Sequence, residues 1–204
     1  MTSEPKGSSG GWVEVSTATP IWGRFFLPSP LVLIGTKEGE GFDLAPKHMA
    51  MPIGWENYFG FVCTPQHATY HNAQRENGFT VSVPKPSQVI MTSLAAQPPG
   101  ESGRRVGLES LPTESARTME GILLRESHLQ LECELERVVD GFGPNSLIVG
   151  RVQAARVDAG AVRESGVDDG VVLKRAPLLV YLSPGRLCEA SASTPFPFPA
   201  DFSR

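Results

Sequence analysis

Three short apolar runs separated by polar loops occupy the first half of this 204-residue chain. They span residues 31–34, 58–63 and 79–83, lengths that suit strands better than helices. β-branched and aromatic residues, which favour strands, make up much of each run. Polar loops between neighbouring strands can frame a ligand site. We therefore expect the functional site in this part of the chain.

The second half of the chain adds an amphipathic hairpin. Residues 129–139 alternate between apolar and polar side chains, residues 140–143 form the turn, and residues 146–155 return as a second strand. This alternation is typical of antiparallel sheets with one solvated face. A further apolar strand is expected at residues 178–182. With Pro 18 and Gly 21 available for turns, the pattern predicts a mainly β fold, and the length favours one domain.

The ends of these strands carry weaker signals. Residues 12–19 alternate like an edge strand. Pro28 and Pro30 predict a break before the first core strand, because proline cannot donate to a strand ladder. A short strand at residues 42–44 is expected to end in a loop that Pro46 restrains.

Helices are expected only as short covers. Thr69 is interpreted as the N-cap of a helix over residues 70–76, which Asn77 and Gly78 would end. Two further helices are predicted, one at residues 85–96 and a shorter one near residues 106–110. The segment from residue 164 to 170 reads as an acidic linker.

Composition narrows the class of protein. A formal net charge of −4 does not suggest a nucleic-acid surface, and no run approaches the length of a membrane helix. Residues 1–11 lack the regions of a signal peptide, so we expect a mobile tail on a cytoplasmic protein. Three widely spaced cysteines argue against a disulfide framework, and Cys63 and Cys133 are expected to be buried thiols.

Several motifs occur in an order that is familiar as a whole. They read Ala45-Pro46-Lys47-His48, Thr69-Tyr70-His71-Asn72, Phe79-Thr80-Val81-Ser82-Val83-Pro84 and Leu147-Ile148-Val149-Gly150-Arg151-Val152. In this order the chain resembles the flavin reductase-like family, the FMN-binding split barrels, over roughly residues 20–185.

The resemblance implies a six-stranded, mostly antiparallel split β-barrel with a few short flanking helices, occupying residues 12–193. It also implies a homodimer that binds FMN at the subunit interface. Residues 194–204 read TPFPFPADFSR, an extended apolar tail that needs a covering surface. We expect the partner subunit to cover it.

Two loops are the candidate flavin contacts. The resemblance places Pro46, Lys47, His48 and Met49 against the isoalloxazine ring, with His48 where serine is common in the family. From the residues alone, a solvated loop histidine is the favoured interpretation of His48.

The second loop is the candidate phosphate site, formed by His67, Thr69, His71 and Asn72. A hydroxyl, an amide and a helix N-terminus could all face one dianion. Family members often carry Arg or Lys just before the threonine, where this chain has Gln66 and His67. The alternative is that Thr69 is an ordinary helix cap.

The hairpin departs from the family in a way that matters for function. Many members have a Gly-Asp-His sequence near the nicotinamide, whereas this chain reads Gly143-Pro144-Asn145-Ser146. Asn145 could bind a carboxamide or be a plain turn residue. This departure leaves two flavoprotein functions open: hydride transfer from NADH or NADPH to FMN, or electron transfer with small-molecule redox partners and no nicotinamide.

Other chemistry is less well supported. The sequence has no dinucleotide-binding glycine motif, nucleophile elbow or zinc-protease helix. We expect no metal site and no catalytic side-chain acid or base, because the flavin would carry the chemistry. A β-barrel that binds another ligand without catalysis is the remaining alternative.

Overall fold

The computed structural model describes residues 11–97 and 106–199. Its strands are β1 (Leu27–Pro30), β2 (Val32–Glu38), β3 (Gly41–Lys47), β4 (Ala50–Pro52), β5 (Tyr58–Cys63), β6 (Gly78–Val83), β7 (Thr113–Ser115), β8 (Ile122–Leu124), β9 (Leu129–Phe142), β10 (Asn145–Val157), β11 (Leu178–Ser183) and β12 (Arg186–Ala190). Its helices are α1 (Ala68–Arg75), α2 (Val89–Ala95), α3 (Val106–Glu109) and α4 (Asp169–Arg175), with single 3₁₀ turns at Ile21–Gly23 and Pro86–Gln88.

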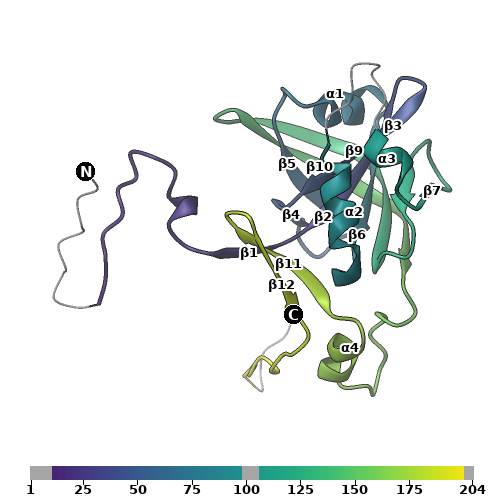
Figure 1. Ribbon diagram of the computed structural model, residues 1–204. Coiled ribbons are helices and arrows are strands. Elements are labelled where there is room, and N and C mark those ends of the chain that lie inside the picture. Colours follow the sequence, from purple (N-terminus) through teal and green to yellow (C-terminus); the bar gives the residue numbers. More distant parts are fainter. Residues whose placement is uncertain (1–10, 98–105, 200–204) are drawn as a thin grey trace.

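One curled antiparallel sheet forms the body of the molecule (Figure 1). Its described strands follow the order β3-β2-β6-β9-β10-β5-β4. Six of them make the barrel that the sequence predicted, and the three-residue β4 extends one edge. The predicted hairpin is confirmed, since β9 and β10 pair along their length with three register shifts. The mainly β, split-barrel fold class is therefore confirmed.

Both faces of the central strands are covered, as the continuous apolar runs indicated. Successive residues of a strand point to opposite faces, and Val32, Leu33 and Ile34 are all buried. Val32 and Ile34 join the barrel core, where the rings of Phe61 and Phe79 meet edge to face at 5.0 Å. Leu33 faces a second apolar cluster that includes residues of α2 and β8.

The short helices lie where the sequence placed them, with one correction. α1 begins one residue before the predicted cap, because His67 has the extended backbone of an N-cap (φ −96°, ψ 142°). Thr69 is thus inside the first turn and is not the cap. α2 and α3 confirm the helices expected at residues 85–96 and 106–110. The helix α4 occupies the end of the predicted acidic linker, where the Asp168 carboxylate accepts the amide of Gly170 as an N-cap.

A separate three-stranded sheet, β1-β11-β12, contains β1, a strand that the sequence did not predict. The predicted break before the first core strand is confirmed, since β1 ends at Pro30 and β2 begins at Val32 in another sheet. Pro28 and Pro30 themselves lie in β1, an edge strand that pairs with β11. Residues 12–19 form no strand. They belong to residues 11–26, here called the arm, which extends away from the barrel (Figure 1).

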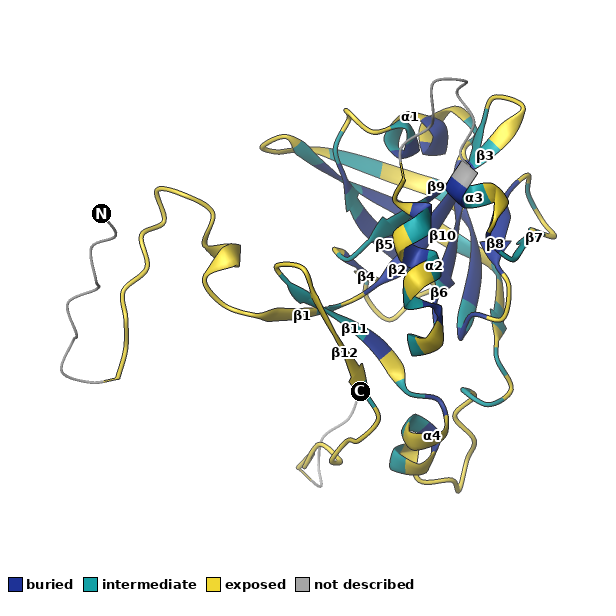
Figure 2. Ribbon diagram, in the orientation of Figure 1, coloured by how far each residue is buried: buried dark blue, intermediate teal, exposed yellow. Residues whose placement is uncertain are grey.

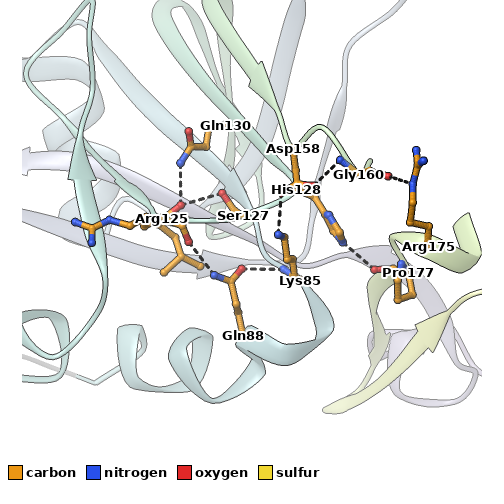
Figure 3. A network of polar contacts seen from close by, with 11 residues as sticks. Lys85, Gln88, Arg125, Ser127, His128, Gln130, Asp158, Gly160, Arg175 and Pro177 are labelled. Carbon is orange, nitrogen blue, oxygen red and sulfur yellow. Dashed lines mark hydrogen bonds and ion pairs between the residues drawn. The ribbon is translucent and has the colours of Figure 1, made fainter. Parts of the chain in front are cut away.

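A polar network ties this outer sheet to the barrel (Figure 3). His128 directly precedes β9 and is buried, and its Nε2 lies 2.9 Å from the carbonyl oxygen of Pro177. Pro177 directly precedes β11. Nearby, Lys85 forms an ion pair with Asp158 at 2.9 Å. The ion pair lowers the pKa of Asp158 below its ordinary value, chiefly through the hydrogen bond from Lys85.

Candidate functional site

A cavity of ≈ 530 Å³ opens where β3 ends beside the start of α1. The predicted loop at Ala45-Pro46 is in fact the last part of β3, so Pro46 and Lys47 are held by the sheet. Pro46, Lys47, His67 and Thr69 all line this cavity. Four of the predicted site residues, taken from two segments twenty residues apart, are therefore brought together.

The mouth of this cavity is polarised for an anion. Lys47 Nζ lies 3.5 Å from His67 Nδ1. Ala68 and Thr69, the first two residues of the eight-residue helix α1, also line this cavity. The first amides of a helix have no intrahelical acceptor and carry partial positive charge. Together these groups can bind a phosphate or carboxylate.

Acidic groups share the same wall. The Thr69 hydroxyl donates to Asp43 Oδ2 at 3.0 Å, and both residues are buried. The hydroxyl thus already has an acceptor within the protein, which differs from the predicted hydroxyl contact to phosphate. Asp43 was missed from the sequence, although a carboxylate between Phe42 and Leu44 in an apolar strand is a signal for such a partner.

The structure does not bring the other two residues of the predicted phosphate loop to this cavity. Asn72 is buried on the inner side of α1, and its amide donates to the Thr36 hydroxyl at 3.3 Å. His71 is exposed, and its Nε2 lies 2.7 Å from the carbonyl oxygen of Pro65. Both side chains have structural partners, so the groups left to face an anion are Lys47, His67 and the start of α1.

A second, smaller cavity of ≈ 230 Å³ adjoins the first and shares Pro46, Lys47 and His67 with it. His48 and Met49, from the connection between β3 and β4, form another part of its wall. The remaining lining residues come from the end of β5 and the hairpin: Val62, Cys63, Thr64 and Asn145. The hairpin segment that lacks the family histidine therefore reaches the site through Asn145.

His48 has a partner that no local pattern predicted. Its ring packs against Tyr181 of β11, with centroids 4.3 Å apart and planes tilted by 31°. Burial, and next the charge of Lys47, lower the pKa of His48 below its ordinary value. His48 is thus a half-buried, neutral imidazole at neutral pH and not a solvated loop residue. Its contact also joins the barrel to the outer sheet.

The thiols and carboxylates of the described chain offer no other centre. Cys63 and Cys133 are buried, as expected, and burial raises the pKa of both thiols. Within residues 11–97 and 106–199, no group of three or more His, Cys, Asp or Glu side chains is placed to hold a metal ion. No helix of this part of the chain is long and apolar enough to span a membrane.

Comparisons with known proteins agree with this geometry. A family model described as the flavin reductase like domain matches residues 22–188. Among solved structures, 2-nitrobenzoate 2-nitroreductase of Pseudomonas fluorescens superposes with a TM-score of 0.76 at 15% identity, covering 94% of this chain and 99% of its own. Flavoredoxin from Methanosarcina acetivorans gives 0.74 at 17% identity, covering 94% and 97%. An FMN-binding protein from Thermus thermophilus with bound p-hydroxybenzaldehyde gives 0.68 at 20%, covering 97% and 99%.

Proposed function

Because this chain belongs to the flavin reductase-like family, we propose that it binds FMN in the two adjoining cavities and reduces it with NADH or NADPH. The observation that carries the proposal is the pairing of an anion-binding corner, at Lys47 and the start of α1, with a less charged cavity at His48. The flavoprotein class is that of the family, and similarity to the FMN-binding protein from Thermus thermophilus supports the choice of FMN.

The residues present fit the phosphate end of FMN. Lys47 supplies a full charge, His67 lies beside it, and the amides of Ala68 and Thr69 add the helix N-terminus. Glu38 and Asp43 line the same cavity and oppose a dianion. Because the Thr69 hydroxyl donates to Asp43, Thr69 would offer the phosphate its backbone amide only. This arrangement gives Lys47 the largest share of the attraction.

The second cavity, here called the ring cavity, is lined by groups that suit the isoalloxazine end of FMN. Bound FMN supplies the hydride-accepting chemistry, and the protein supplies position and electrostatics. His48 keeps its imidazole uncharged beside Tyr181, and Met49 adds apolar surface. Burial, the largest effect on the Cys63 thiol, raises its pKa and keeps it protonated. No side chain here is required as a catalytic acid or base.

The hairpin residue that would bind the nicotinamide differs from the family pattern, with Asn145 in the segment where many members have histidine. Asn145 lines the ring cavity, and its side-chain amide can pair with a carboxamide, which has both a donor and an acceptor. The same departure favours the second function, an FMN-dependent electron carrier that reacts with small-molecule redox partners and not with NAD(P)H.

Anaerobic mixing separates these two functions. Purified protein saturated with FMN should lose its visible flavin absorbance when NADH or NADPH is added, and Asn145→Ala should slow that loss. Bleaching by dithionite but by neither nicotinamide would leave the electron carrier as the function. Absence of FMN binding altogether would contradict both and leave a barrel that binds another ligand.

We also propose that the protein is a homodimer. The arm and the tail expose large aromatic side chains that a monomer would leave in water: Trp12, Phe25, Phe26, Phe196 and Phe198. Burying such side chains against a second copy is favourable by about 1.5–3 kcal/mol each. Light scattering should give a dimer, and removal of residues 194–204 should weaken it. A monomer that binds FMN with full affinity would contradict this proposal.

A further inference from the structure

A third cavity, of ≈ 510 Å³, lies between β1, β4 and the connection from β3 to β4. It adjoins the ring cavity, because His48 and Met49 line both. We propose that this third cavity, here called the β1 cavity, binds a neutral aromatic molecule with one hydrogen-bonding group. The binding inference rests on the cavity itself; its interpretation as the site of the second substrate rests on the proposed function.

The walls of the β1 cavity select an apolar occupant. The apolar lining residues include Trp22, Leu27, Met49 and Met51. Methionine is flexible and makes favourable contacts with aromatic rings. The volume lies within the range of about 300–1,000 Å³ that is usual for small-molecule pockets. A planar ring system fits both the chemistry and the size.

The polar groups of the β1 cavity select a neutral occupant. None of its described lining residues is Lys, Arg, Asp or Glu, so a charged ligand would lose hydration without gaining a counter-ion. The hydroxyl of Ser29 is buried in the wall and has no hydrogen-bond partner among the described residues. An unpaired buried hydroxyl is costly, and rotation of the Ser29 side chain toward a ligand that supplies a donor or acceptor would remove this cost.

The position of the β1 cavity favours a small molecule over a second copy of the chain. His48 separates it from the ring cavity, so an occupant would lie beside whatever fills that cavity. The exposed phenylalanines of the arm, Phe25 and Phe26, could reach such a cavity in a partner but have no group for Ser29. Occupation by a partner's arm is therefore the alternative that the experiment must separate.

Calorimetric titration with two isosteric probes tests the inference on the FMN-saturated protein. The probes are 2-naphthamide, which is neutral, and 2-naphthoate, which is an anion. We expect the amide to bind at least about ten-fold more tightly. Met51→Glu should weaken the amide about ten-fold or more, because it places a carboxylate in the cavity wall. Ser29→Ala should weaken it by a smaller factor.

A matched variant controls for the added charge. Val171→Glu makes the same kind of change at a similarly exposed residue of α4, outside the cavity, and should leave amide binding unchanged. FMN titration of Met51→Glu reports on the flavin site and should match the unsubstituted protein. If the Met51 effect persists in a protein that does not bind FMN, the proposed function fails and the β1 cavity stands.

Three results would overturn the inference. Equal affinity for the amide and the carboxylate would remove the selection for a neutral ligand. Equal effects of Met51→Glu and Val171→Glu would place the probe elsewhere. Amide binding that appears only on dilution of a dimer to monomer would show that a partner's arm fills the cavity.

Discussion

The barrel and the arm that leads into the outer sheet both contain phenylalanines but bury them to very different extents. In the barrel, Phe61 and Phe79 are fully buried, whereas in the arm that leads into β1, Phe25 is 74% exposed. Figure 2 shows the same contrast, with dark strands in the barrel and exposed residues along the arm and β12. The difference indicates that the barrel is stabilised by its own packing, while the outer sheet and arm leave apolar surface exposed that a ligand or a second copy could cover.

Breaking the barrel core should have the largest effect. Phe79→Ala removes a fully buried ring that packs against Phe61, and such changes cost about 3–5 kcal/mol of unfolding free energy. Phe25→Ala, in the arm, should change monomer stability by less than about 0.5 kcal/mol. Urea unfolding at a protein concentration that keeps the chain monomeric measures both. Similar losses for the two variants would erase the contrast between the regions.

Thiol reactivity sharpens the same comparison. Burial, and next the Glu132 carboxylate, raise the pKa of Cys133 in the barrel to about 12. Cys188, in β12, is exposed. At pH 8 only about one Cys133 in ten thousand is a thiolate, so iodoacetamide should modify Cys188 at least about a hundred-fold faster. Mass spectrometry of timed samples would show this, and early alkylation of Cys133 would mean that the barrel opens readily.

The sequence predicted the barrel better than the outer sheet for a physical reason. Residues 129–139 and 146–155 form a hairpin, so alternation and a nearby turn were sufficient to predict their pairing. β1 instead pairs with β11, which lies far along the chain, and Pro28 and Pro30 masked it. In the site, the resemblance of two loops to the family motifs indicated Lys47 and His67. The Thr69–Asp43 bond and the His48–Tyr181 contact depend on long-range register, which no local pattern contains.

Loosening the tether between the regions should have a smaller effect. His128→Phe keeps a ring in the buried space but removes the hydrogen bond to the Pro177 carbonyl, a loss of about 1 kcal/mol. Hydrogen exchange should quicken in β11 and remain unchanged in β6. His71→Phe removes a similar bond to the Pro65 carbonyl beside α1 and should leave β11 exchange unaltered. Uniform exchange changes in His128→Phe would argue against a local tether.

The contact between His48 and Tyr181 should give the smallest effect, one that depends on pH. The pKa of His48 is lowered in the native state, chiefly by burial, so below its ordinary value of 6.5 the unfolded chain binds a proton that the native chain does not. The free energy of unfolding should therefore fall as pH drops through 6.5 toward the native pKa. His48→Phe, which keeps a ring against Tyr181, should lose less stability between pH 7 and pH 5. Parallel curves for the two proteins would place the titration elsewhere.

The central claim is that the barrel binds the FMN phosphate at Lys47 and the start of α1. Parallel titrations of FMN and riboflavin into Lys47→Gln, with Lys174→Gln on α4 as the control, test it most directly. A charge-assisted contact is worth about 1.5–3 kcal/mol, so Lys47→Gln should weaken FMN by about ten- to a hundred-fold. Riboflavin, which has no phosphate, should be little affected, and Lys174→Gln should affect neither. Equal losses of FMN and riboflavin affinity, or no loss of either, would contradict the claim.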